Sequence, residues 1–134
     1  MYAPRLPAEG TATVLLVDDE DGLRVAEART LRREGFTVLE AHDGLAAVQL
    51  FANHASEIGI VVLDMTLPGL SGTDVCEEIR RLKSDVPVLF TSAQSSIGPE
   101  EPGTLANERF LAKPYPLREL VQTIREMIVT PAPQ

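Results

Sequence analysis

The sequence predicts one α/β domain, a doubly wound parallel sheet with helices on both faces. Five short apolar runs alternate along the chain with stretches in which apolar residues recur at helical spacing. Right-handed crossovers between successive parallel strands place such helices on the two faces of the sheet. The run IVVL at 60–63 is continuous, as in strands covered on both sides. A length of 134 residues suffices for one core but not for two.

The apolar runs TVLLV, TVLE, IGIVVL, VPVLFT and RFLA predict strands at 13–17, 37–40, 58–63, 86–91 and 109–112. The stretches between and after them predict helices at 22–34, 44–55, 73–83 and 117–129. Gly35 is expected to end the first helix, Asp43 to open the second and Pro116 to start the last. The last helix has the clearest apolar stripe, made by Leu117, Leu120, Val121, Ile124, Met127 and Ile128.

Composition indicates the bounds of this domain, its cellular compartment and the partners that it excludes. Residues 1–12 and 130–134 are rich in Pro, Ala and Gly and are expected to be flexible tails, so the domain spans 13–129. The single Cys76 excludes an internal disulfide and fits a reducing compartment. No run is long enough to span a membrane, and the start lacks the apolar block of a signal peptide. A net charge of −8 argues against nucleic-acid binding, so we expect a cytoplasmic module without direct membrane contact.

Polar residues follow four of the predicted strands. Five strands in a chain of this size fit the flavodoxin-like fold, for which we take the order 2-1-3-4-5 with its ligand site at the carboxyl ends of the strands. In that order strands one, three, four and five are neighbours, so the polar residues after them converge. These residues are Asp18, Asp19, Asp64, Thr91, Ser92 and Lys113. Carboxylate oxygens suit Mg²⁺, and a lysine suits a phosphate oxygen.

Four motifs carry a resemblance to a known family. They are VDDE (17–20), DMTLPGLSG (64–72), TSA (91–93) and KPY (113–115), in this order along the chain. Together they resemble the receiver domain of two-component response regulators and hybrid histidine kinases, over about 13–129. The resemblance implies a phosphoacceptor domain that switches conformation and catalyses its own phosphorylation and dephosphorylation. Its implied partner is a histidine kinase or a histidine phosphotransfer domain.

The resemblance also implies a role for each residue at the strand ends. Asp64 would take the phosphoryl group from phosphohistidine. Asp19 and Asp64 would bind Mg²⁺ directly, with Mn²⁺ as a possible substitute. Asp18 would act through a water molecule, and the backbone carbonyl of Thr66 would complete the protein ligands. Lys113 would neutralise charge on the transferring phosphoryl group.

A hydroxyl and an aromatic residue would couple phosphorylation to a conformational switch. Spacing from Pro87, and the need for a small residue next, favour Ser92 followed by Ala93 as the hydroxyl, with Thr91 as second choice. The aromatic residue three positions before the lysine is Phe110, which lacks the hydroxyl of a tyrosine.

Two further expectations concern the last part of the chain. In the family the peptide bond before the motif proline is commonly cis, which predicts a cis Lys113–Pro114 bond. Receivers also carry a helix between strands four and five. Here the interval 94–109 holds two prolines and two glycines, so we expect that helix to be degenerate or irregular.

Three other functions fit the sequence less well than that of a receiver domain. A P-loop nucleotide hydrolase needs a Gly-Lys pair, and the chain has none. A flavin-binding domain would meet repulsion between its phosphate and the acids of DDED at 18–21. A degenerate receiver that acts as a phosphorylation-independent interaction module remains an alternative, although the set of acids and lysine is intact. The sequence also leaves open a stand-alone regulator or a receiver segment of a hybrid kinase.

Overall fold

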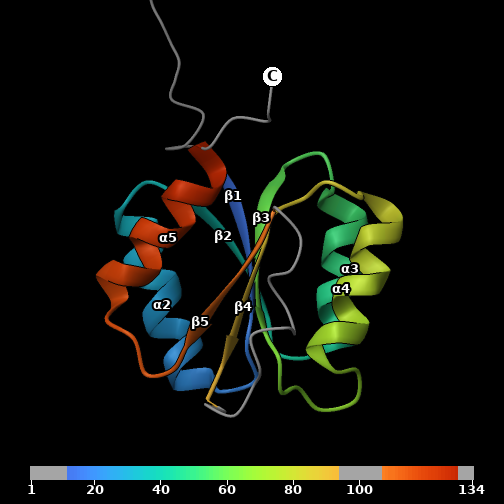
Figure 1. The fold of residues 1–134 in the computed structure, drawn as a ribbon, viewed down its shortest axis with the longest axis horizontal. Helices are drawn as coiled ribbons and strands as arrows, with labels where there is room; N and C mark the ends of the chain where they lie inside the picture. Colours follow the sequence, from blue (N-terminus) through green and yellow to red (C-terminus); the bar gives the residue numbers. More distant parts are fainter. Residues whose placement is uncertain (1–11, 94–106, 130–134) are drawn as a thin grey trace, which may run out of the picture.

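The computed structural model describes residues 12–93 and 107–129 (Figure 1). The strands in it are β1 (Thr13–Val17), β2 (Thr37–Ala41), β3 (Ile58–Asp64), β4 (Val88–Ser92) and β5 (Glu108–Ala112). The helices are α2 (Asp21–Arg33), α3 (Gly44–His54), α4 (Gly72–Leu82) and α5 (Leu117–Val129). Every predicted strand and each of the four predicted helices has a counterpart. The predicted irregular helix falls largely on 94–106, outside the described residues.

The strands form one parallel sheet in the order β2-β1-β3-β4-β5, as predicted. Helices α2 and α5 cover one face, and α3 and α4 cover the other (Figure 1). The largest error in an element's start is at β4, which begins at Val88 rather than at 86. Pro87 has no N–H to give to the ladder, and only its carbonyl accepts, from the Val61 N–H.

The sheet separates two apolar cores. Successive residues of β1 and β3 point to opposite faces, so both strands are buried throughout their apolar runs. Toward α2 and α5 the strands contribute Val14, Leu16, Ile60 and Val62. Toward α3 and α4 they contribute Leu15, Val17, Val61 and Leu63. This explains the continuous rather than alternating pattern of these segments.

The helix ends follow the local signals in the sequence. Gly35, just after α2, has a φ of 103°, which disfavours residues with a side chain. Asp43 caps α3 by accepting from the Ala46 N–H at 2.8 Å. Helix α2 begins at Asp21, one residue before the predicted start, and Glu20 is its N-cap.

The start of α4 lies directly against the end of β3. A methyl group added at Gly72 would come within 2.7 Å of the Asp64 carbonyl oxygen and of the Met65 Cα atom. The residue before it, Ser71, forms a capping box with Asp74. A close approach of helix to strand therefore fixes the backbone around Asp64.

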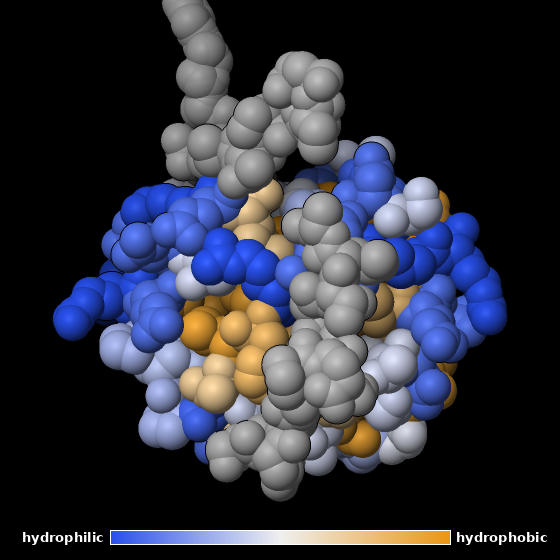
Figure 2. Space-filling view, in the orientation of Figure 1, coloured by the Kyte–Doolittle hydropathy of each residue, from blue (hydrophilic) through white to orange (hydrophobic). Residues whose placement is uncertain are grey.

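The surface and the helices agree with a globular domain. Figure 2 shows hydrophilic side chains over most of the face seen in Figure 1, with apolar side chains gathered beside β5. Cys76 is buried on α4, as its place in the apolar stripe predicts. Within 12–93 and 107–129, no helix is long and apolar enough to cross a membrane.

Candidate functional site

The carboxyl ends of β1, β3 and β5 bring an acidic cluster and a lysine together. The register pairs Val17 of β1 with Leu63 of β3, so Asp18 and Asp64 emerge at the same edge. The Lys113 Nζ atom lies 2.8 Å from Asp18 Oδ2 and 3.3 Å from Asp64 Oδ2. The predicted convergence of these three residues is confirmed.

Asp19 completes the cluster. One carboxylate oxygen from each of Asp18, Asp19 and Asp64 lies within 4.8 Å of the others. Asp18 and Asp64 are buried, at 2% and 4% exposure, whereas Asp19 is exposed. Two acids of the cluster are thus shielded from solvent, and the third is open to it.

The charged groups of this cluster shift one another's pKa values. Burial raises the pKa of Asp64, the nearby Asp18 adds to the rise, and the Thr66 N–H and Lys113 oppose it. Burial would lower the pKa of Lys113, but its hydrogen bonds and charge interactions with Asp18 and Asp64 outweigh this and raise it. The lysine therefore stays charged over the physiological pH range. It offsets only part of the negative charge around it.

The carboxylate oxygens of Asp18 and Asp64 accept hydrogen bonds from backbone N–H groups and from Lys113. Asp18 Oδ1 accepts from the Glu20 N–H at 2.8 Å, while its Oδ2 accepts from Lys113. Asp64 Oδ1 accepts from the Thr66 N–H at 2.9 Å, which holds Thr66 beside it. Both oxygens of Asp18 and both oxygens of Asp64 therefore have partners, and these hydrogen bonds do not distinguish a direct from an indirect role for either residue. The oxygen-only donor set fits Mg²⁺ or Mn²⁺.

The two candidate hydroxyl residues at the end of β4 lie on opposite faces of the sheet. Thr91 shares the face of Leu89, toward α2 and α5, and its side chain interacts with the Tyr115 hydroxyl. Ser92 shares the face of Phe90, and its carbonyl accepts from the Lys113 N–H at 2.8 Å. Both residues are buried. Thr91 is therefore engaged on the side of the sheet away from Ser92.

Phe110 lies on β5, and Lys113 and Pro114 follow the end of this strand. Phe110 is opposite Phe90 in the register and packs, partly buried, against the core on the α3 and α4 side. The Lys113–Pro114 peptide bond is cis, which confirms that prediction.

A buried acid on α2 is part of this environment and was missed from the sequence. Glu27 is 1% exposed, and its Oε2 accepts from the Tyr115 hydroxyl at 2.7 Å. Burial raises the pKa of Glu27 to about 7; Asp18 and Asp64 add to the rise, while Tyr115 and Lys113 oppose it. Spacing offered one signal, since Glu27 lies four residues before the buried Leu31, on the apolar stripe of its helix.

Arg24, also missed, supports the loop after β1. Its Nη1 donates to the Asp18 carbonyl at 2.8 Å and pairs with Asp21 at the same distance. Its Nε donates to Glu40 of β2 at 3.1 Å. The guanidinium therefore ties the backbone that carries the acidic cluster to both α2 and β2.

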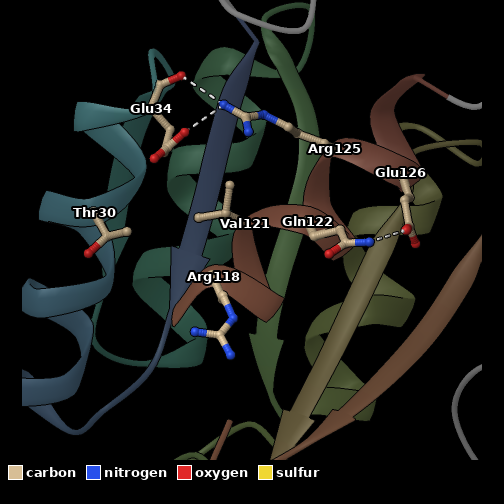
Figure 3. Close-up of a pocket in the computed structure, with 7 residues that line it drawn as sticks. All are labelled: Thr30, Glu34, Arg118, Val121, Gln122, Arg125 and Glu126. Atoms are coloured by element: carbon tan, nitrogen blue, oxygen red, sulfur yellow. Dashed lines mark hydrogen bonds and ion pairs between the residues drawn. The ribbon is translucent and has the colours of Figure 1, made fainter. Parts of the chain in front are cut away.

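A groove of about 650 Å³ lies elsewhere, between α2 and α5 (Figure 3). Its lining is Thr30, Glu34, Arg118, Val121, Gln122, Arg125 and Glu126, none of them in the acidic cluster. Arg125 pairs with Glu34 across it at 2.8 Å. The groove is open to solvent, and it has no part in the site described above.

Comparison with known proteins identifies the class of signalling domain to which this fold and this site belong. The family model of the response regulator receiver domain matches residues 14–125. The chain belongs to the response regulator receiver domain family.

Curated relatives include both sensor kinases and response regulators. The chain is 36% identical over 121 residues to the sensor kinase CckA of Brucella abortus, covering 89% of this chain and 13% of that protein. It is 40% identical over 117 residues to the sensory transduction protein RegX3 of Mycobacterium tuberculosis, covering 87% of this chain and 50% of that protein. The chain thus spans half or less of these relatives.

Solved structures of receiver domains and response regulators have a fold similar to that of this chain. The receiver domain of the hybrid histidine kinase CckA matches with a TM-score of 0.76 and 29% identity, covering 87% of this chain and 99% of that one. The non-phosphorylated HemR receiver domain from Leptospira biflexa matches with a TM-score of 0.78 and 30% identity, covering 92% and 98%. The response regulator TrrA from Thermotoga maritima, solved with Mg²⁺ and a beryllium fluoride, matches with a TM-score of 0.75 and 28% identity, covering 87% and 98%.

Proposed function

We propose that this receiver accepts a phosphoryl group from phosphohistidine on Asp64 and changes conformation as a result. The observation that carries the proposal is the lysine: the Lys113 Nζ atom reaches both Asp18 and Asp64 from the segment after β5. A structural ion pair needs one carboxylate. Two buried carboxylates and a third exposed one are what phosphoryl transfer with a divalent cation requires.

The proposed reaction is an in-line displacement. An oxygen of the Asp64 carboxylate attacks the phosphorus of phosphohistidine, a P–O bond forms, and the P–N bond breaks. The imidazole leaves and takes up a proton. The ammonium of Lys113 stays charged at neutral pH and neutralises charge on the phosphoryl oxygens, so the chain's own contribution is position and electrostatics.

The cation site follows from the same acids. Asp19 and Asp64 would ligate Mg²⁺ directly, Asp18 would act through water, and the Thr66 carbonyl would complete the protein ligands. Mn²⁺ would take the same oxygens. Bound there, the cation would shield the acids from one another and draw the phosphoryl oxygens toward Asp64. The TrrA match, solved with Mg²⁺ and a phosphoryl mimic, supports this assignment.

Ser92 is the proposed switch hydroxyl, with Thr91 as second choice. The engagement of Thr91 with Tyr115 on the opposite face favours Ser92. Phe110 is the proposed switch aromatic. Because Phe110 has no hydroxyl, its movement would be guided by packing alone.

The proposed partner is a histidine kinase or a histidine phosphotransfer domain in the cytoplasm, engaged by the domain at 13–129. The relatives include a sensor kinase and a response regulator, so both a hybrid-kinase receiver and a separate regulator fit. The intact acids and lysine argue against the alternative of a degenerate, phosphorylation-independent receiver.

Intact-mass measurement tests the proposal. Incubated with Mg²⁺ and acetyl phosphate, the protein should gain one phosphoryl group, and EDTA should prevent the gain. Asp64→Asn should abolish it. Asp85→Asn, which removes an exposed acid just before β4, is the matched control and should behave as wild type. Label that persists in Asp64→Asn would refute the assignment of the acceptor.

A further inference from the structure

Glu27 and Tyr115 form a buried polar contact between α2 and the segment that carries Lys113. The Tyr115 hydroxyl donates to Glu27 Oε2 at 2.7 Å. The Tyr115 hydroxyl also interacts with the Thr91 side chain, and the ring packs against the apolar core between the sheet and helices α2 and α5. Within the described residues, the second oxygen, Glu27 Oε1, is buried without a hydrogen-bond partner.

A carboxyl group in this position is costly for the fold alone. It lies on the apolar stripe of α2 beside the buried Ala28 and Leu31, where an aliphatic side chain would fit the core. A buried carboxyl with one unpartnered oxygen loses hydration that no hydrogen bond replaces, and this destabilises the fold. Apart from its one hydrogen bond to Tyr115, Glu27 makes no contact that would compensate for this cost among the described residues. The effect of this hydrogen bond on Tyr115 therefore needs to be considered.

Tyr115 is two residues after Lys113 in the chain, across Pro114. The segment has two anchors on neighbouring elements. On one side the Lys113 N–H donates to the Ser92 carbonyl of β4 at 2.8 Å. On the other, the Tyr115 hydroxyl is held by α2. Between these anchors the Lys113 side chain runs to the acidic cluster, and without the second anchor only its own ion pairs would fix its direction.

We propose that Glu27 is a positioning residue for Lys113: by holding the Tyr115 hydroxyl it fixes the segment from which the lysine reaches Asp18 and Asp64. The kinetic consequence rests on the proposed phosphoryl transfer to Asp64, but the positioning itself does not. It is a property of the metal-free protein.

The chain offers a direct readout of this positioning, because it holds only two lysines, Lys83 and Lys113. In protein labelled with ¹⁵N-lysine, the ammonium protons of Lys113 should exchange slowly with water while its ion pairs are fixed. Lys83 lies elsewhere, near the carbonyls of Ala55 and Ile58, and serves as an internal reference. Tyr115→Phe should speed the exchange at Lys113 several-fold and leave Lys83 unchanged.

Two variants at position 27 separate the hydrogen bond from the charge. Glu27→Gln keeps an acceptor for the tyrosine and removes the charge, so Lys113 exchange should stay close to wild type. Glu27→Leu removes both and should also speed the exchange at Lys113, whereas Tyr115→Phe, which loses the Thr91 contact as well, should give an effect at least as large. Ile124→Val, a buried change on α5 in the same core, controls for stability loss and should leave Lys113 unaffected.

Phosphoryl acceptance from acetyl phosphate gives the second arm. The rate should fall on the order of tenfold in Tyr115→Phe and in Glu27→Leu, as expected when a reacting group is misplaced, and should be retained in Glu27→Gln. If wild type accepts no phosphoryl group, the proposed function fails, while the exchange arm still decides the positioning. Wild-type exchange at Lys113 in Tyr115→Phe, or equal loss in Ile124→Val, would overturn the proposal.

Discussion

Replacing Glu27 by Gln should change how the stability of the domain depends on pH. The folded protein raises the pKa of Glu27 from 4.5 to about 7 because the carboxyl is buried. An acid with a raised pKa binds its proton more tightly in the folded state than in the unfolded state. Its stabilising effect is therefore complete below pH 4.5 and is lost as the pH rises through about 7.

The size of this loss follows from the two pKa values. With 4.5 for the unfolded chain and about 7 for the folded one, wild type should lose about 2.5 kcal/mol from this group between about pH 5 and about pH 8. Glu27→Gln has no proton to lose, so this part of the pH dependence should vanish. Its amide can still accept from Tyr115, but its NH₂ group is buried without a partner, which costs about 1 kcal/mol. The variant should be slightly less stable than wild type at low pH and more stable at high pH.

Urea unfolding followed by far-ultraviolet circular dichroism measures this, since the chain has no tryptophan to serve as a fluorescent probe. The measurements should be made with EDTA present, so that metal binding does not add its own pH dependence. Glu77→Gln on the exposed side of α4 is the matched control and should leave the wild-type curve unchanged. Parallel curves for wild type and Glu27→Gln would refute the reasoning, because they would mean that Glu27 is ionised in the folded protein at all of these pH values.

Three other predictions follow from the same structure. Asp19→Asn should raise the thermal unfolding midpoint of the metal-free protein and lower its affinity for Mg²⁺, both measured by calorimetry. A lower midpoint without metal would contradict a repulsive acidic cluster. Gly72→Ala should cost about 1–3 kcal/mol in urea unfolding, because its methyl group meets the backbone of Asp64, and should slow phosphoryl acceptance; unchanged stability would show that α4 can move away. Gly35→Ala should cost about 1 kcal/mol because of its positive φ, yet leave phosphoryl acceptance unaffected; slowed acceptance would show that the end of α2 is coupled to the site.

Much of the fold could be predicted because local signals and burial agree. The continuous apolar runs of β1 and β3 are buried on both faces, and Gly35 and Asp43 stand where the helix ends need them. The error at β4 has a backbone cause, since the side chain of Val86 is buried as the apolar pattern suggests, yet Pro87 cannot donate to the ladder. Apolar pattern reports burial, and backbone hydrogen bonds decide where a strand starts.

The acidic cluster and Lys113 could be placed from the sequence because parallel strands end at one edge. Once the strand order is assumed, the residue after each strand must lie there. Glu27 and Tyr115 could not be found this way. They belong to a helix and a loop, and although spacing places Glu27 on the buried stripe of α2, it does not identify the residue that Glu27 contacts. Their contact depends on how α2 and the segment after β5 pack together.

The distribution of protons explains how one lysine can serve so acidic a site. Glu27 brings a fourth carboxyl group toward Asp18, Asp19 and Asp64, and its electrostatic interactions with Asp18, Asp64 and Lys113 show that it is close enough to matter. If it were ionised, it would compete with Asp18 and Asp64 for Lys113. Its raised pKa keeps it largely protonated below about 7, and its hydrogen bond comes from an uncharged hydroxyl. The positive charge of Lys113 is thereby reserved for Asp18 and Asp64, the two carboxylates to which its ammonium is hydrogen-bonded.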